Sequence, residues 1–160
     1  MGHYATAQVC LNGHAVTGDT GFSEGLEKFC STCGAETITA CPSCHTPIRG
    51  DYKASGILSF APYTPPAYCH QCGKPFPWTE SALSAAAELV EDMEELNSED
   101  QEKFKTSIMD IAFESPRTSL AANRIAKYLR QVAPSTQDAF KTIMYGIAAE
   151  AAKRLIWPIP

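Results

Sequence analysis

All seven cysteines of the chain lie between residues 10 and 72, and with one histidine they form four close pairs. Thiolate sulfur and imidazole nitrogen are the ligands of structural zinc sites, which take four to an ion in a tetrahedral arrangement. The four pairs therefore supply enough ligands for two ions, with none left over. The pairs are Cys10 with His14, Cys30 with Cys33, Cys41 with Cys44, and Cys69 with Cys72.

Two of these pairs look like copies of one element, and this repeat indicates how the four combine. Segments 29–34 and 68–73 share an aromatic residue before the first cysteine and a glycine after the second, with a spacing of 39 residues. Two sequential ribbons are expected, each closing with such a copy. The expected sets are Cys10, His14, Cys30 and Cys33 for site 1, and Cys41, Cys44, Cys69 and Cys72 for site 2. The alternative is a cross-braced arrangement, because spacing alone does not fix connectivity.

Each site is expected to hold one structural Zn2+. Thiolates and imidazole suit a borderline-soft ion without redox activity, and a closed set of four leaves no position for water. Iron is the alternative in the all-cysteine site, since four thiolates also hold iron. His3 is the alternative to His14, because aligning Cys10 with Cys41 places Gly13, and not the histidine, opposite Cys44.

Short strands and turns are expected to position these ligands. Residues 34–40 are rich in Thr and Ile and predict a strand. Residues 45–68 contain several prolines, glycines and aromatic residues and predict a long ribbon loop, with one hairpin as an alternative, the kind of segment that often carries binding function. Arg49, Asp51 and Tyr52 are the candidate partner-binding residues there, although a salt bridge and a packed ring are the preferred explanation for them.

From Thr79 onward the apolar residues recur at helical spacing. Thr79 is the predicted N-cap of a first helix, and Ser98 with Gln101 forms a predicted capping box for a second. Ser115 and the proline after it predict the start of a third helix. A last helix is predicted over 136–155, with an apolar face that runs to Leu155. The chain is therefore expected to be an α+β protein, with a double zinc ribbon over 1–78 and a bundle of about four helices over 79–160.

Charge is distributed unevenly along the chain. Residues 79–114 carry eleven acidic and two basic side chains, whereas residues 115–160 carry seven basic and two acidic ones. Neighbouring helices that neutralise one another explain this asymmetry most simply, and a nucleic-acid surface is the alternative. The basic residues for that alternative are Arg117, Arg124, Lys127 and Arg130 of the third helix, together with those of the 45–68 loop.

No nucleophile motif, phosphate-binding loop or zinc-protease motif occurs in the sequence, so an enzyme is not expected, with an enzyme of unrecognised type as the alternative. No apolar run is long enough to cross a bilayer, and the first thirty residues lack the pattern of a secretory signal. Paired cysteines are typical of metal sites in a reducing compartment. A cytoplasmic location is therefore expected.

The segments CLNGH, FCSTCGAETITACPSCHTPIRGDY and YCHQCGKPFPWTESAL resemble a family of uncharacterised bacterial proteins, known only as a domain of unknown function, with a zinc-ribbon N-terminal half. The resemblance implies a bacterial cytosolic origin and metal-binding cysteines, and it brings no activity or substrate. The function expected from these observations together is that of a non-enzymatic adaptor or regulator. Its ribbons would form a rigid platform, and its helices would dock a protein partner or a second copy.

Overall fold

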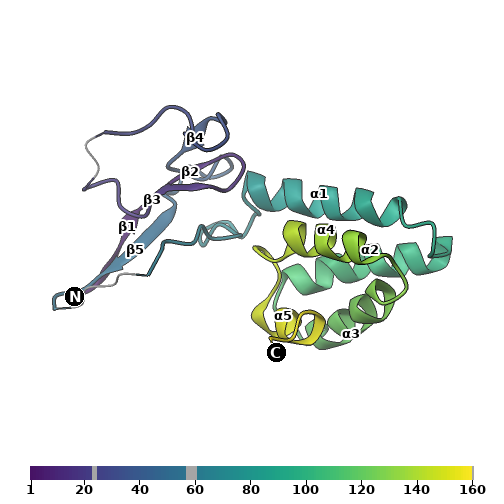
Figure 1. Ribbon diagram of the computed structural model, residues 1–160. Coiled ribbons are helices and arrows are strands. Elements are labelled where there is room, and N and C mark those ends of the chain that lie inside the picture. The colour runs from purple at the N-terminus through teal and green to yellow at the C-terminus, as the bar shows by residue number, and fades with distance from the viewer. Residues whose placement is uncertain (23–24, 57–60, 160) are drawn as a thin grey trace. The chain divides into compact units, whose positions relative to one another are not determined.

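Two compact units, Met1–Glu80 and Ser81–Pro160, make up the chain in the computed structural model, which describes residues 1–22, 25–56 and 61–159. Short strands and two cysteine-rich groups lie in the first unit, and the second is helical (Figure 1). The expected α+β fold is therefore confirmed. The division falls between residues 80 and 81, inside the first helix, where 78 and 79 were expected.

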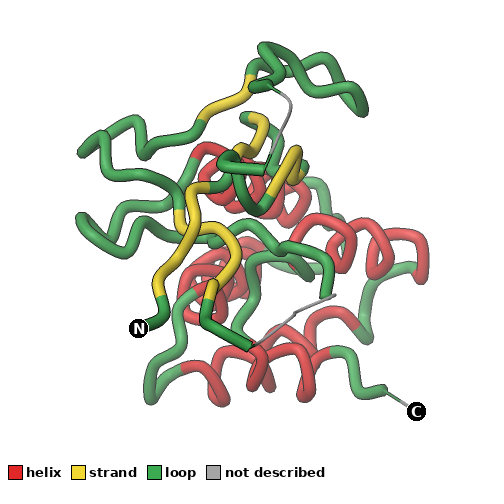
Figure 2. Tube along the Cα trace, turned by 90° about the vertical axis from the view of Figure 1, so that its left-hand side faces the viewer, coloured by secondary structure: helices red, strands yellow, loops and turns green. Residues whose placement is uncertain are grey.

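In the described part of the first unit, short strands form two small antiparallel sheets. β1 pairs with β5, and β2 lies between β3 and β4. The strands are β1 (His3–Thr6), β2 (Gln8–Cys10), β3 (Ala15–Thr17), β4 (Thr37–Ile38) and β5 (Arg49–Lys53). The strand expected over 34–40 is thus only two residues long. Much of the rest of this unit is loop and turn, drawn in green in Figure 2.

The long loop expected over 45–68 is wrong in its first part, because Arg49–Lys53 forms β5. This strand runs beside β1 (Figure 1). Tyr52 pairs with Tyr4 across the two strands. Ile48, the residue before the strand, is buried, and its backbone bonds to Thr39 and Ala7. Pairing with the N-terminal strand therefore holds this segment in place. Residues 57–60 of the expected loop, including Phe60, lie outside the described residues.

The core of the first unit joins the strands to the start of the first helix. It consists of Ala7, Val9, Cys41, Ile48, Cys69, Phe76 and Trp78. The rings of Phe76 and Trp78 stack with centroids 4.7 Å apart, and the Trp78 indole donates to the carbonyl of Pro66 at 3.0 Å. Thr79 is not the N-cap that was predicted, because the helix already begins at Pro77 and the Thr79 hydroxyl donates to the carbonyl of Ala67.

The second unit is built from helices around a cluster of aromatic rings. The helices are α1 (Pro77–Glu91), α2 (Ser98–Ala112), α3 (Thr118–Leu129), α4 (Pro134–Met144) and α5 (Glu150–Ile156). α3 packs against both α2 and α5. Phe104 of α2 lies between Tyr128 and Phe140, with ring centroids 5.4 and 5.2 Å away. Within the described residues, every helix is too short or too polar to cross a bilayer.

Two predicted helix starts are displaced by a few residues. Asn97, and not Ser98, caps α2, because its side-chain oxygen accepts from the backbone N–H of Asp100 at 2.9 Å. The third helix starts at Thr118, after a turn in which the Ser115 hydroxyl accepts from a backbone N–H and the Thr118 hydroxyl bonds back to Ser115. The cap of α2 therefore lies next to the predicted one, whereas α3 starts three residues after Ser115 and has no side-chain cap at its N-cap residue, Arg117.

The single last helix predicted over 136–155 is wrong, because α4 ends at Met144 and α5 begins at Glu150. Between them the backbone N–H of Ala149 donates to the carbonyl of Ile111 in α2, at 2.8 Å. Ile147 and Ala148 are buried in this break. As a result Leu155, expected on the inner face, is 43% exposed.

Candidate metal centres

Site 1 brings together a histidine and three cysteines from β2 and the turns that follow it. The His14 Nδ1 atom lies 3.5 Å from the Cys10 sulfur, 3.3 Å from that of Cys33 and 3.8 Å from that of Cys30. All four donor atoms lie within 4.8 Å of one another. His14 therefore occupies the fourth position, whereas His3 lies in β1 opposite Lys53.

Site 2 brings together four cysteines. The sulfur atoms of Cys41 and Cys72 are 3.8 Å apart, and those of Cys44 and Cys69 are 3.6 Å apart. These four donor atoms also lie within 4.8 Å of one another. The structure thus combines the pairs sequentially, and the cross-braced alternative is wrong.

Three of the four pairs share one backbone turn. In each, the N–H of the residue after the second cysteine donates to the carbonyl of the first cysteine, at 2.8 to 2.9 Å. That residue has a positive φ: 73° at Gly34, 60° at His45 and 71° at Gly73. Glycine adopts this conformation without cost, whereas a histidine is strained there. The Cys41 turn is therefore a third copy of the repeat, which the glycine pattern alone did not reveal.

Isolated bridges close the same three turns, between Phe29 and Glu36, Ala40 and Pro47, and Tyr68 and Pro75. The sequence does contain one signal of the third copy, because Pro47 lies six residues after Cys41 just as Pro75 lies six residues after Cys69. Each copy therefore delivers two thiols from one short loop.

The first pair follows a different turn. The N–H of Gly13 donates to the carbonyl of Cys10 at 2.8 Å, and Gly13 has a φ of 87°. A Cβ atom at this position would lie 2.9 Å from the Cβ atom of Trp78. The backbone N–H of His14 donates to the Cys10 sulfur at 3.2 Å. Any residue larger than glycine at position 13 would therefore require Trp78 or the backbone to move. The second ligand of this pair, His14, is four residues after the first, whereas the second cysteine of the other three pairs is three residues after the first.

At Cys33 and Cys44, hydrogen-bond donors favour the thiolate form, which is the form that binds metals. The backbone N–H of Ala35 lowers the pKa of Cys33 to about 6, with further contributions from Asn12 and His14. The hydroxyl and backbone N–H of Thr46 lower the pKa of Cys44 to about 6. At Cys72 the backbone N–H of Lys74 is outweighed by desolvation and by three neighbouring thiols, which raise the pKa to about 11. The first cysteine of each turn is buried, and the second is exposed or half-buried. Each site offers four donor atoms, the number that a tetrahedral ion takes, and so can hold one metal ion.

The candidate partner-binding residues of β5 lie on an exposed sheet. The Arg49 guanidinium lies 4.7 Å from the centroid of the Tyr4 ring, and the Tyr4 and Tyr52 rings meet edge to face at 5.1 Å. The Tyr63 hydroxyl donates to the carbonyl of Arg49 at 2.6 Å. Asp51 is half-buried, and its backbone N–H donates to the carbonyl of Gly18.

The basic residues predicted along the third helix do not behave as one group. Arg117 caps the start of α3 and pairs with Asp110, with 3.1 Å between Nε and Oδ2. Arg130 lies at the other end of the helix, as its C-cap. Arg124 is half-buried and Lys127 is exposed. Part of this charge is thus neutralised within the second unit.

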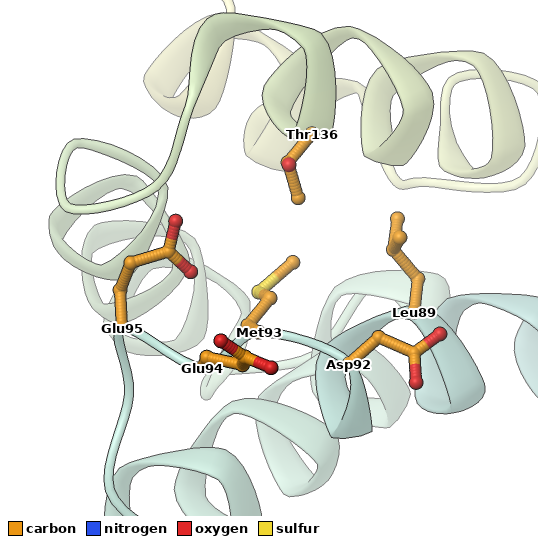
Figure 3. A pocket seen from close by; sticks show the side chains of 6 residues that line it. All are labelled: Leu89, Asp92, Met93, Glu94, Glu95 and Thr136. Carbon is orange, nitrogen blue, oxygen red and sulfur yellow. The ribbon is translucent and has the colours of Figure 1, made fainter.

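The second unit also contains an acidic cavity of about 420 Å3, shown in Figure 3. Its lining consists of Leu89, Asp92, Met93, Glu94, Glu95 and Thr136. The carboxylates stand around Leu89 and Met93, and Thr136 reaches in from α4. The three acidic side chains are exposed and lie in the turn that connects α1 to α2, where carboxylates are solvated.

Comparisons with known proteins identify a family without an assigned activity. No curated protein and no solved structure matches the chain. The model of the family described as "Uncharacterized protein conserved in bacteria (DUF2321)" matches residues 3–156, and the chain therefore belongs to this family.

Proposed function

We propose that this chain is a non-enzymatic adaptor in which two structural Zn2+ ions support a protein-binding surface. Each site supplies a complete set of four donors, which leaves no coordination position for a substrate or a water nucleophile. The imidazole of His14 in site 1 suits zinc, and the thiolates of site 2 suit zinc or iron. Zinc in both sites is the simpler proposal, because the turns of the two sites are copies of one element.

The observation that carries this proposal is the cluster formed by Tyr4, Arg49 and Tyr52 on the β1–β5 sheet. The side chains of Tyr4 and Tyr52 are 52% and 51% exposed although they touch each other, and Arg49 is exposed as well. Tyrosine and arginine are enriched among the residues that dominate binding energy in protein interfaces.

A second exposed ring lies beside the same sheet, but on its other face, because the side chains of Tyr52 and Lys53 alternate along β5. Phe22 is 86% exposed, and its ring lies 5.1 Å from the ammonium group of Lys53, the last residue of β5. Lys53 forms an ion pair with Asp19, with 3.0 Å between Nζ and Oδ2. Phe22 therefore does not belong to the proposed surface, which consists of Tyr4, Arg49 and Tyr52.

The sheet is anchored to the metal sites, which gives a binding surface the rigidity that it needs. Ile48 precedes β5 and is 1% exposed, and its N–H donates to the carbonyl of Thr39, two residues before Cys41. Gly50 lies against backbone, since a Cβ atom there would be 1.9 Å from the carbonyl oxygen of Gly18. Displacing β5 would therefore disturb the region that supplies site 2.

The test is affinity capture from the native cell with the zinc-loaded wild-type chain, the double variant Tyr52→Ala/Arg49→Ala, and Phe29→Ala as the control. Phe29 is a similarly exposed aromatic residue of the same unit, 55% exposed. We expect a partner that the wild type and the control retain and the double variant binds at least roughly tenfold more weakly, because residues that dominate an interface cost about 2 kcal/mol or more. Equal capture by all three chains would refute the proposed surface.

The coordination number of the metals tests the non-enzymatic part separately. X-ray absorption at the zinc edge should show four sulfur or nitrogen ligands per ion, with no oxygen. A water ligand on either ion would instead indicate an open position and favour a catalytic role.

A further inference from the structure

A cavity of about 360 Å3 lies in the second unit, lined by residues of α3, α4, the end of α5 and the segment that follows it. Its apolar residues include Leu129, Leu155, Ile156 and Trp157, and its basic residues are Arg130 and Lys141. Small-molecule sites have volumes of this order and use a few polar groups to orient the ligand. The lining of this cavity is about equally polar and apolar, so it suits a ligand that has both kinds of group. The mixture of lining residues therefore defines the class of ligand.

The apolar wall is fixed in position but incompletely covered. The Trp157 ring lies 6.1 Å from that of Phe140 and 5.8 Å from that of Tyr145, between centroids. The backbone N–H of Trp157 donates to the carbonyl of Lys153 at 2.8 Å. Leu155 nevertheless remains 43% exposed. Covering this surface with an apolar ligand is favourable, and the wall loses little freedom in doing so.

In the part of the chain that the structure describes, the two cations of the cavity have no carboxylate partner. Elsewhere in this unit Arg117 pairs with Asp110, and Lys153 pairs with Glu150. Among the described residues no carboxylate lies within ion-pair distance of Arg130 or Lys141. Lys141 does lie 5.7 Å from the centroid of the Tyr145 ring. Both cations are exposed and therefore able to bind an anion.

One acidic residue, Asp138, also lines the cavity. It is exposed, and it lies one turn before Lys141 on α4. The lining therefore carries two positive charges and one negative charge, and residues 115–160 as a whole carry seven basic and two acidic side chains. The sign of the local charge favours an anionic ligand over a neutral or cationic one.

We propose that this cavity binds a small amphipathic carboxylate, with its apolar body against Leu155 and Trp157 and its acid group on Arg130 and Lys141. Hydrogen bonds between a cation and a carboxylate are stronger than those between neutral groups. This site belongs to the second unit and does not depend on the binding surface proposed for the first. Cations near helix C-termini also stabilise the helix dipole, so the test must separate binding from stability.

The experiment titrates decanoate into the zinc-loaded full chain, monitored by calorimetry and tryptophan fluorescence, below the micelle concentration. Acetate supplies the acid group without the apolar body, and decyltrimethylammonium supplies the chain with the opposite charge. We expect saturable one-to-one binding of decanoate with a shift in the emission of Trp157, and much weaker binding of both control compounds. The variant Trp157→Phe should lose the fluorescence change, because the other tryptophan, Trp78, lies in the first unit.

Three variants test which charged side chains contribute to decanoate binding. Arg130→Gln/Lys141→Gln should weaken decanoate binding by roughly tenfold or more, the size expected when charge-assisted contacts are lost. Lys127→Gln, on the same helix but outside the lining, should leave it unchanged. Asp138→Asn should strengthen binding by about two- to fivefold, since like charge is removed. Thermal unfolding of each variant measures its effect on stability separately.

Several results would overturn the proposal. They are the absence of saturable binding, equal affinity for decyltrimethylammonium, competition by acetate at concentrations similar to those of decanoate, and unchanged affinity in the Arg130/Lys141 double variant. Unchanged or weaker binding in Asp138→Asn would likewise contradict it, because a purely structural role for these residues predicts no gain in affinity.

Discussion

Gly13 provides a sharp test of how site 1 is built. Its φ of 87° lies in the left-handed region, and a Cβ atom would approach the Trp78 side chain to 2.9 Å at Cβ and 3.0 Å at Cγ. The matched control is Gly34 in the same site, which has a φ of 73° and where an added Cβ atom would have no neighbour within 4 Å. Alanine at either position therefore meets a similar backbone cost, but only Gly13→Ala also meets a neighbour.

The expected magnitudes follow from these two contributions. A left-handed conformation costs a residue other than glycine about 1–2 kcal/mol. Alanine also lowers the conformational entropy of the unfolded chain, which offsets about 0.4–1 kcal/mol of this cost. Gly34→Ala should thus destabilise the first unit by about 1 kcal/mol. Crowding in a packed core adds about 1–3 kcal/mol, which brings Gly13→Ala to about 2–4 kcal/mol.

Hydrogen exchange of peptides from residues 1–80, measured at equal free zinc, reports these free energies of opening directly. Gly13→Ala should exchange roughly fivefold to 100-fold faster than Gly34→Ala, because the two variants differ by about 1–3 kcal/mol and about 1.4 kcal/mol corresponds to a factor of ten. If the two variants exchange at the same rate, the contact between Gly13 and Trp78 does not constrain the site, and the reasoning is wrong.

Three other substitutions test the turns and caps. His45→Gly should stabilise the first unit by about 0.5–1 kcal/mol in urea unfolding, because it relieves a φ of 60°, and a loss of stability would show that the imidazole makes a contact of its own. Asn97→Ala should cost the helical unit about 1 kcal/mol, as measured by its thermal unfolding, and Ser98→Ala less; the reverse order would restore Ser98 as the cap. Cys72→Ser should raise hydrogen exchange in residues 41–76 and leave α2 and α3 protected, and a joint loss would mean that the units unfold together.

The grouping of the metal-site residues could be predicted because it depends on local geometry. A turn that carries two ligands three or four residues apart is specified by those few residues, and the 39-residue repeat orders the turns along the chain. The third copy was missed because its positive φ is taken by His45, where the other two copies have glycine. A histidine in this conformation gives no signal in a sequence pattern.

The pairing of β1 with β5 could not be predicted, because the two strands are far apart in the sequence and neither shows a strong alternation of apolar residues. The cluster of Tyr4 with Arg49 and Tyr52 depends on this pairing. The sequence therefore identified Arg49, Asp51 and Tyr52 as individual candidates, but it did not identify Tyr4 as part of the same cluster.

Helix ends were predicted less well than helices, and each error has a local or tertiary cause. Asn97 and Ser98 are both good caps, and the backbone uses the first of them. The break at 145–149 interrupts a sequence with continuous helical periodicity, because Ala149 bonds to the carbonyl of Ile111 in another helix. The exposure of Leu155, and with it the cavity beside Trp157, follows from that break.

Native mass spectrometry of the full chain, combined with metal analysis, tests the central claim most directly. The two four-donor sites predict two zinc ions per chain, and the variants Cys33→Ser and Cys72→Ser should each lose one of them. A wild-type chain that carries one zinc ion or none, or iron in site 2, would contradict the account.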